Sequence, residues 1–284
     1  MRIQHNITAL NSHRNLTNNN SSLTKNLEKL SSGYRINRAG DDAAGLAISE
    51  KMRAQITGLQ TAQKNSEDGV SLVQTAEGAL TEVHSMLNRM VELATQSANG
   101  TYSSANRAEM QKEVKALQAE IDRISNTANF NGTTLFTGTT ASVAIHAGET
   151  SKDANQIKIT LSAMSAKSMT AKIGGTSTTI KLNSDVNVST ATLAKASIDK
   201  INTAIDIVSS MRSDFGALQN RLEHTINNLG VQTENLSAAE SRIRDVDMAK
   251  EMMAYTKNNI LVQASQAMLA QANQVPQGVL QLLQ

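Results

Sequence analysis

Apolar residues recur at intervals of three and four positions along the first part of the chain, from about residue 3 to about residue 124. This spacing places them on one face of an α-helix, in a stripe of the coiled-coil type. Two such stripes are Val73, Ala76, Leu80, Val83, Leu87, Met90 and Ala94, and then Met110, Val114, Leu117, Ile121 and Ile124. The pattern therefore predicts long amphipathic helices in this part of the chain.

The last part of the chain repeats the pattern from Ile198 onward, with few departures. Its stripe comprises Ile198, Ile201, Ile205, Val208, Met211, Phe215, Leu218, Leu222, Ile226, Leu229, Leu236, Ala239, Ile243 and Val246. Each amphipathic limb needs an apolar partner, and the other limb is the nearest one. We therefore predict a mainly α fold of long antiparallel helices in coiled-coil or bundle domains, with both termini at the same end.

The middle of the chain, from about residue 130 to 194, is rich in Thr, Ser and Gly and has a different period. Apolar residues alternate with polar ones around Val143 and again around Ile159, and Ile180 follows the turn signal Gly174-Gly175. These features predict a small β-rich insert over residues 141–194, with short strands and a hairpin. We expect it to be an exposed cap whose residues 151–187 can be replaced by a short linker.

Composition supports a helical class. The chain of 284 residues has three Phe, three Tyr and no Trp, so its core must be built from aliphatic residues, Met and Ala. Its single proline, Pro276, lies close to the end of the sequence, so almost nothing interrupts long helices.

Charge and missing motifs exclude several classes of function. A net charge of +2 and few aromatic residues argue against a nucleic-acid partner. The sequence contains no apolar run long enough to span a membrane and no signal-peptide pattern at its start. No cysteine is present, the five histidines are scattered, and no nucleophile, phosphate-loop or metal motif occurs. We therefore expect no enzyme activity, no cofactor, no metal and no membrane partner.

A break in the helical pattern occurs at Gly40, followed by Asp41 and Asp42. Two adjacent carboxylates could serve a metal or an acid–base site. No further acidic cluster or His stands near them in the sequence to complete such a site, so we interpret them as the cap of a helix that begins at about residue 43.

The segment 258–284 contains no Asp, Glu, Lys or Arg, yet is too rich in Gln and Asn to cross a bilayer. A pair of helices can bury only one face of each, so such an uncharged amphipathic tail predicts a protein surface as its partner. We expect the ends of the chain to become ordered when further copies of the chain cover them.

Three long strings resemble the signatures of the bacterial flagellin family. They are KLSSGYRINRAGDDAAGLAI at residues 29–48, SRIRDVDMA at residues 241–249 and LAQANQVP at residues 269–276. The resemblance covers roughly residues 1–135 and 195–284. It implies a secreted structural subunit that polymerises into the flagellar filament for swimming.

The resemblance also implies a domain arrangement and an export route. Residues 1–40 and 243–284 would form an inner helical core domain, residues 41–140 and 195–242 a helical outer domain, and residues 141–194 the variable insert. Export through the flagellar type III channel needs no cleaved signal peptide. The implied partners are other copies of the chain, an export chaperone, and the filament cap and hook-filament junction proteins.

Two groups of site residues follow from the resemblance. The segment 87–99 is similar to the helix that Toll-like receptor 5 recognises, with Arg89, Leu93, Gln96 and Glu113 at the matching positions. We expect Arg89, Leu93 and Gln96 to lie off the core stripe, free for contacts with a receptor or with other copies. The tail is expected to serve polymerisation and chaperone binding through its apolar residues Ile260, Leu261, Met268, Leu269, Val275, Val279, Leu280, Leu282 and Leu283.

Two other classes of protein share these helical patterns. A hook-associated or type III needle-like structural protein would also pair its terminal helices. A cytoplasmic coiled-coil signalling hairpin has similar heptads, but its termini lead to membrane helices and its tip carries no β insert.

Overall fold

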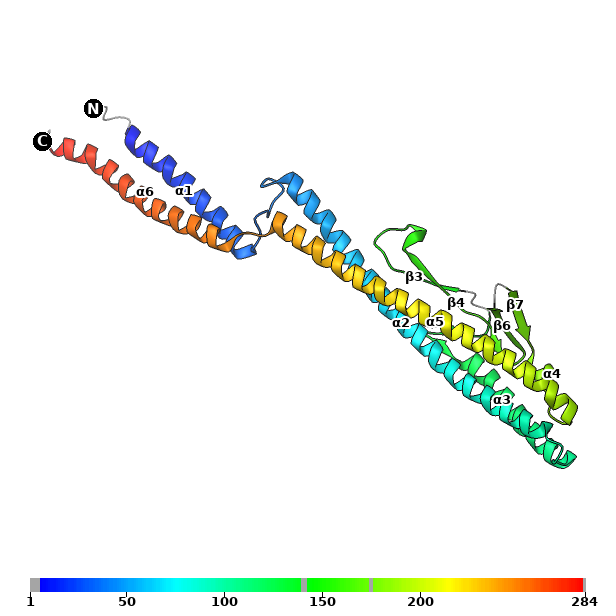
Figure 1. Ribbon diagram of the computed structural model, residues 1–284. Helices are drawn as coiled ribbons and strands as arrows, with labels where there is room; N and C mark the ends of the chain where they lie inside the picture. Colours follow the sequence, from blue (N-terminus) through cyan, green and yellow to red (C-terminus); the bar gives the residue numbers. More distant parts are fainter. Residues whose placement is uncertain (1–5, 139–141, 174–175, 283–284) are drawn as a thin grey trace. The chain divides into compact units, whose positions relative to one another are not determined.

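Long helices make up most of the structure, a computed structural model that describes residues 6–138, 142–173 and 176–282. Side chains are described outside residues 170–178 and 275–282. The long helices are α1 (Ile7–Ser32), α2 (Ala43–Ala98), α3 (Ser104–Thr127), α5 (Ala191–Arg244) and α6 (Met248–Leu282) (Figure 1). The mainly α fold class is therefore confirmed.

The chain forms two compact units. Residues 1–56 and 234–284 form one, here called the terminal unit, and residues 57–233 form the other, the middle unit. The predicted division into inner, outer and insert domains is a different one, based on expected place in a filament, and stays a prediction.

In the terminal unit, α1 and α6 pair side by side and antiparallel (Figure 1). Asn6 donates a hydrogen bond to the carbonyl of Ala272, and Asn19 donates one to Ser265, so residue numbers rise along one helix as they fall along the other. The ends of the two helices that carry the chain termini therefore lie together, as predicted.

Local signals fix where these helices begin and end. The side chain of Asn6 caps α1 by accepting a hydrogen bond from the N–H of Ala9, and Gly33 ends it in the left-handed region at φ 75°. Asp42 caps α2 through the N–H of Gly45 at 2.9 Å, as the sequence indicated. Asp41 has a different role, because its carboxylate accepts from the N–H groups of Asn37 and Arg38 within the turn.

The backbone N–H groups of Arg38 and then Asn37, with Lys29 and Lys25 nearby, lower the pKa of Asp41. A lowered pKa means that the carboxylate is better stabilised in the folded turn than in the unfolded chain. Asp41 thus keeps the turn between α1 and α2 in shape while Asp42 starts the helix.

The middle unit has a continuous apolar core built on the predicted stripes. Every member of the α2 stripe from Val73 to Ala94 is fully buried. Antiparallel α5 packs on one side of it, where Arg212 lies 3.6 Å from Glu77, and α3 runs antiparallel along another side, where Arg107 donates to the carbonyls of Ser97 and Asn99. From α3 and α5 the core takes Val114, Ile121, Ile201, Val208, Met211, Phe215 and Leu222.

Strands occur where the sequence alternates. In the middle unit, β3 (Ser142–His146) pairs antiparallel with β4 (Gln156–Thr160), with Val143 opposite Ile159. A second, antiparallel sheet has the order β5 (Met164–Ser165), β6 (Ser168–Ile173), β7 (Thr176–Ile180), and β1 (Asn129–Phe130) pairs with β2 (Thr133–Thr134). The short helices η1 (Asp153–Asn155) and α4 (Leu182–Asp185) complete the insert. The predicted turn at Gly174-Gly175 lies outside the described residues.

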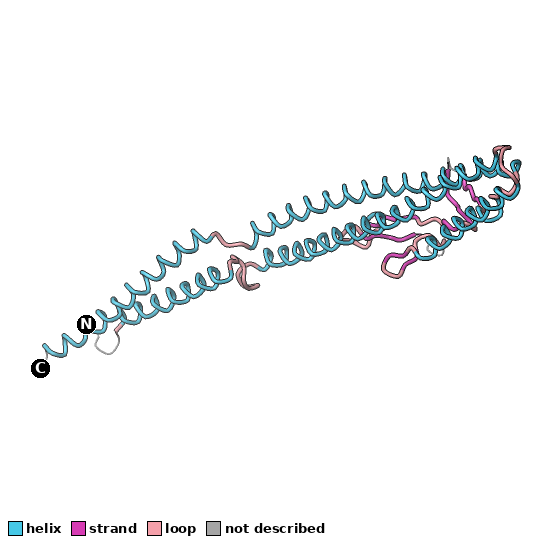
Figure 2. The backbone as a smooth tube through the Cα atoms, turned by 90° about the horizontal axis from the view of Figure 1, so that it is seen from below, coloured by secondary structure: helices cyan, strands magenta, loops and turns pink. Residues whose placement is uncertain are grey.

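The expectation that the insert is exposed is wrong for much of it, whereas the replacement of residues 151–187 by a linker stays a prediction. Figure 2 shows the strands lying along the helices, and several side chains of this region are buried in the same core, namely Met164, Ala166, Met169, Ile180, Leu182, Val186 and Val188. Polar groups of α3 also hold the insert: Gln118 donates to the carbonyl of Leu182 at 2.8 Å, and Asp122 accepts from the N–H of Ala166. The insert therefore covers a helix face that would otherwise be open to water.

The burial of the insert predicts a large effect at Leu182, whose side chain is 0% exposed. Leu182→Ala should lower the free energy of unfolding of the middle unit by about 2–5 kcal/mol, because it leaves a cavity in a packed core. The matched control Leu193→Ala, at a side chain 45% exposed, should change it by no more than about 0.5 kcal/mol. Chemical denaturation of the two variants followed by circular dichroism tests this. Equal, small effects would restore the cap interpretation.

Candidate interaction surfaces

The terminal helices expose many apolar side chains. Within Ile7–Ser32, all of which the structure describes, no residue is buried. Leu10 is 65% exposed in α1, and Met253 is 68% exposed in α6. Among the described side chains of the terminal unit, only Ile36, Gly45 and Ser49 are buried, and none of them lies in α1 or α6.

The predicted tail residues are placed in part. Ile260, Leu261 and Met268 are exposed on α6, and Leu269 is partly buried. The side chains of Val275, Val279, Leu280 and Leu282, and Leu283 as a whole, lie outside the described residues. Met253, Ile260 and Met268 follow each other at steps of seven and eight residues, so they form one apolar stripe on the exposed face of the helix.

The two breaks in the helical limbs of the terminal unit meet each other, which the sequence pattern did not reveal. The N–H of Arg35 donates to the carbonyl of Arg244 at 2.7 Å, and the N–H of Val246 donates to the carbonyl of Gly33 at 3.0 Å. Tyr34 and Asp245 thus form an isolated antiparallel bridge. The sequence indicated a break on one side only, at Gly40, because the apolar stripe of the last limb continues through Val246.

A cluster of charged groups lies on the exposed surface of α2 and α3. The guanidinium of Arg89 lies 2.9 Å from carboxylate oxygens of both Glu113 and Glu92. These hydrogen bonds, the one to Glu113 first, raise the pKa of Arg89. Gln96 donates to the hydroxyl of Tyr102 at 2.9 Å, so three of the four predicted receptor-binding side chains lie on the surface, each held by a neighbour.

Leu93 departs from the expectation, because its side chain is only 2% exposed. The prediction that it lies off the core face was therefore wrong. The stripe through Met90 and Ala94 is the face that a single partner helix would cover. In the structure, α2 packs against both α3 and α5. A helix between two partners buries a wider face, and this face includes Leu93.

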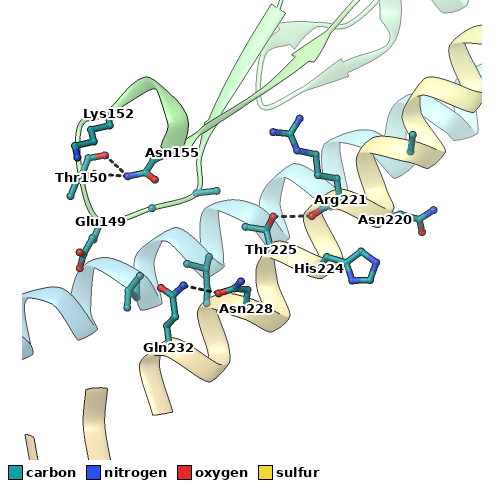
Figure 3. A pocket seen from close by; sticks show the side chains of 15 residues that line it. Glu149, Thr150, Lys152, Asn155, Asn220, Arg221, His224, Thr225, Asn228 and Gln232 are labelled. Atoms are coloured by element: carbon teal, nitrogen blue, oxygen red, sulfur yellow. Dashed lines mark hydrogen bonds between the residues drawn. The ribbon is translucent and has the colours of Figure 1, made fainter. Parts of the chain in front are cut away.

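An open pocket of about 940 Å³ lies in the middle unit between the loop before β4 and the side of α5 (Figure 3). Asn155 organises the loop by donating to the carbonyl of Thr150 at 2.9 Å, and Gln232 donates to Asn228 at 2.6 Å on the helix. Lys152 and Arg221 are among the residues that line the pocket. The carboxylate of Glu149 lines the pocket as well, so the lining carries charges of both signs.

The described residues contain no group of three or more His, Cys, Asp or Glu side chains that could hold a metal ion. In the part of the chain that the structure describes, no helix is both long and apolar enough to cross a membrane. The surfaces described above are thus the candidate sites.

Two sequence profiles match the chain where the long helices lie. The bacterial flagellin N-terminal helical region matches residues 3–141, and the bacterial flagellin C-terminal helical region matches residues 198–283. The chain belongs to the bacterial flagellin family. The residues between the two matched regions include most of the β-rich insert.

Relatives within the flagellin family are similar over the whole chain. The flagellin of Bacillus subtilis strain 168 is 54% identical, and that of Halalkalibacterium halodurans is 53% identical, each with 100% of both chains covered. The solved structure of a flagellar hook-associated protein from Vibrio parahaemolyticus has a TM-score of 0.60 over 72% of this chain and 100% of its own. Its 16% identity shows a shared fold alone.

Membership of the flagellin family assigns the class of function. The chain is a structural protein of the extracellular flagellar filament and not an enzyme. The signalling hairpin is thereby excluded, and the family places the chain with flagellins and not with needle-like proteins.

Proposed function

We propose that this flagellin-family chain polymerises into a filament used for swimming, and that neighbouring copies cover the exposed apolar faces of α1 and α6. The observation that carries the proposal is the contrast between the two units. The α2 stripe of the middle unit is fully buried, whereas α1 has no buried residue along its whole length.

The exposed side chains indicate that the proposed contacts between copies are apolar. Ile7 and Leu10 of α1, with Met253, Ile260 and Met268 of α6, are each between 55% and 68% exposed. Covering the part of each side chain that is still exposed would contribute roughly 1–2 kcal/mol, somewhat over half of the value for full burial. Flexible Met side chains adapt to irregular surfaces, which suits packing against several neighbours. Residues 1–40 and 243–284 would then form the inner core of the filament, and residues 41–140 and 195–242 the domain around it.

The same exposed tail supports the proposed export partners. Before assembly, the uncharged segment from residue 258 onward, with apolar side chains on its surface, would bind other proteins non-specifically. A chaperone that covers Ile260, Leu261, Met268 and Leu269 until export would prevent this. The filament cap and the hook-filament junction proteins would present the surfaces that first order the terminal helices outside the cell.

Deletion of residues 258–284 tests the assembly role. The truncated chain should remain a soluble helical monomer, because the core of the middle unit does not include the tail. It should form no filaments, because the tail is stabilised by contacts between copies. Sedimentation after seeding with filament fragments measures this.

A milder variant separates the loss of apolar contacts from the loss of the tail itself. Met253→Gln, Ile260→Gln and Met268→Gln together keep good helix formers but remove the apolar stripe, and they should also abolish polymerisation. The control Gln266→Ser, at another exposed position of α6, should polymerise normally. Normal filaments from either the truncated chain or the triple variant would contradict the proposal.

We further propose that Toll-like receptor 5 of hosts recognises the surface around Arg89, Gln96 and Glu113. The supporting observation is that Arg89 is half exposed yet held between two carboxylates. A side chain that is already held in place loses little freedom on binding, and Arg is a common anchor at interfaces. Since filament contacts would use the same surface, the receptor would bind the free subunit.

Arg89→Ala tests this second role. The variant should leave the thermal midpoint of the monomer nearly unchanged, because the side chain is on the surface, but weaken both filament assembly and receptor activation. Leu93→Ala is the contrast, since a buried leucine should cost about 2–5 kcal/mol of stability. Lys112→Ala, at an exposed residue paired with Glu109, is the control for loss of a surface charge. Unchanged assembly and signalling would remove Arg89 from the site.

A further inference from the structure

Arg244, the last residue of α5, is held by three parts of the terminal unit. Its guanidinium carbon lies 4.7 Å from the centre of the Tyr34 ring, and its Nη1 donates to Oε1 of Glu50 in α2 at 2.7 Å. Its carbonyl accepts the hydrogen bond from Arg35, whose own side chain donates to the carbonyl of Ile243. The side chain of Arg244 is only 13% exposed, although it carries a charge.

We call these residues the joint: 33–36, 244–246 and Glu50. The buried residues of the terminal unit lie in the joint or beside it. Ile36 is 2% exposed, and a Cβ on Gly45 would come 2.8 Å from its Cδ1, which shows how closely the turn packs on α2. The described packing of this unit is therefore tightest at the joint.

The contact between α1 and α6 has no buried side chain among those described, and its polar links lie in a partly exposed interface. These links include Asn19 with Ser265 and Asn6 with Ala272. Helix pairs whose contacting side chains are alike along their length can slide by one heptad, and a specific polar group commonly fixes their register. A slide of seven residues would move Ser12 or Asn26 to the place of Asn19.

We infer that the joint sets the register in which α1 pairs with α6, and that Arg244 is its main positioning residue. The inference rests on the proposed assembly function, because a correct register is what aligns the apolar stripe of α6 with the exposed residues of α1. Arg suits this role: its planar group stacks on an aromatic ring while its N–H groups bind a carboxylate.

Disulfide trapping in the soluble monomer tests the register directly, since the chain has no cysteine of its own. Asn19→Cys with Ser265→Cys reports the observed register. Ser12→Cys with Ser265→Cys, and Asn26→Cys with Ser265→Cys, report a slide in either direction. Arg244→Gln should lower the yield of the first pair relative to the other two by roughly tenfold, as expected for losing a cation–π contact and an ion pair made by a largely buried guanidinium. Tyr34→Leu should act in the same direction.

Arg242→Gln is the matched control, because this exposed arginine lies in the same turn of α5. It should leave the three yields unchanged. Circular dichroism confirms that the middle unit of each variant still melts cooperatively. If Arg244→Gln and Tyr34→Leu both leave the yield of the Asn19–Ser265 pair unchanged, the inference is overturned, whatever the result of the tail deletion.

Polymer yield then separates positioning from direct contact. Arg244→Gln should polymerise poorly. A disulfide between Asn19→Cys and Ser265→Cys in that variant should restore its polymer yield to that of the same disulfide-linked chain with Arg244 intact. Failure of this lock to restore assembly would show that Arg244 does not act through the register. Tail deletion does not depend on the joint, so a failure here leaves the proposed function standing.

Discussion

Two paired helices can hide only one face of each from water, and this constraint governs the terminal unit. In the middle unit, α2 touches both α3 and α5 and is covered further by the strands, so its stripe disappears from the surface. In the terminal unit, α1 packs against α6, and side chains such as Leu10 and Met253 stay in water. A subunit of a polymer can carry this arrangement because the missing partners arrive with the next copies.

The constraint also explains where polar interactions concentrate. The middle unit gains its specificity from a packed core and from groups such as Gln118, which ties the insert to α3. The terminal unit has almost no core, so its conformation depends on hydrogen bonds and stacking at the joint around Arg244. A charged side chain that is only 13% exposed needs partners, and Arg244 has two of them in the Tyr34 ring and one carboxylate oxygen of Glu50.

The periodicity of apolar residues correctly predicted the features that depend on a single helix. The stripe from Val73 to Ala94 and the cap at Asp42 follow from spacing and residue type alone, and both are present. Leu93 and the insert were misjudged because burial depends on how many partners an element has. The apolar residues from Leu182 to Val188 fall in a short helix and a loop, and their spacing did not show that they are buried in the core. The joint joins residues 208 positions apart, and no local pattern in a single sequence announces such a pairing.

The surface proposed for the receptor was predictable in kind and not in detail. Resemblance to the family identified Arg89, Gln96 and Glu113, and the structure shows them exposed, with Arg89 bonded to Glu113. Of their surroundings, the second ion pair, to Glu92, lies within α2 itself, and Gln96 is linked to Tyr102 in the turn that follows α2.

Amide hydrogen exchange of the monomer and of the assembled filament tests the central claim most directly. In the monomer, amides of α1 and α6 should exchange far faster than those of residues 73–94 in α2, because few buried contacts protect them. In the filament, the terminal amides should become as protected as those of α2. Terminal helices already as protected in the monomer as α2, or unchanged by polymerisation, would show that the terminal unit is complete by itself and would contradict the account.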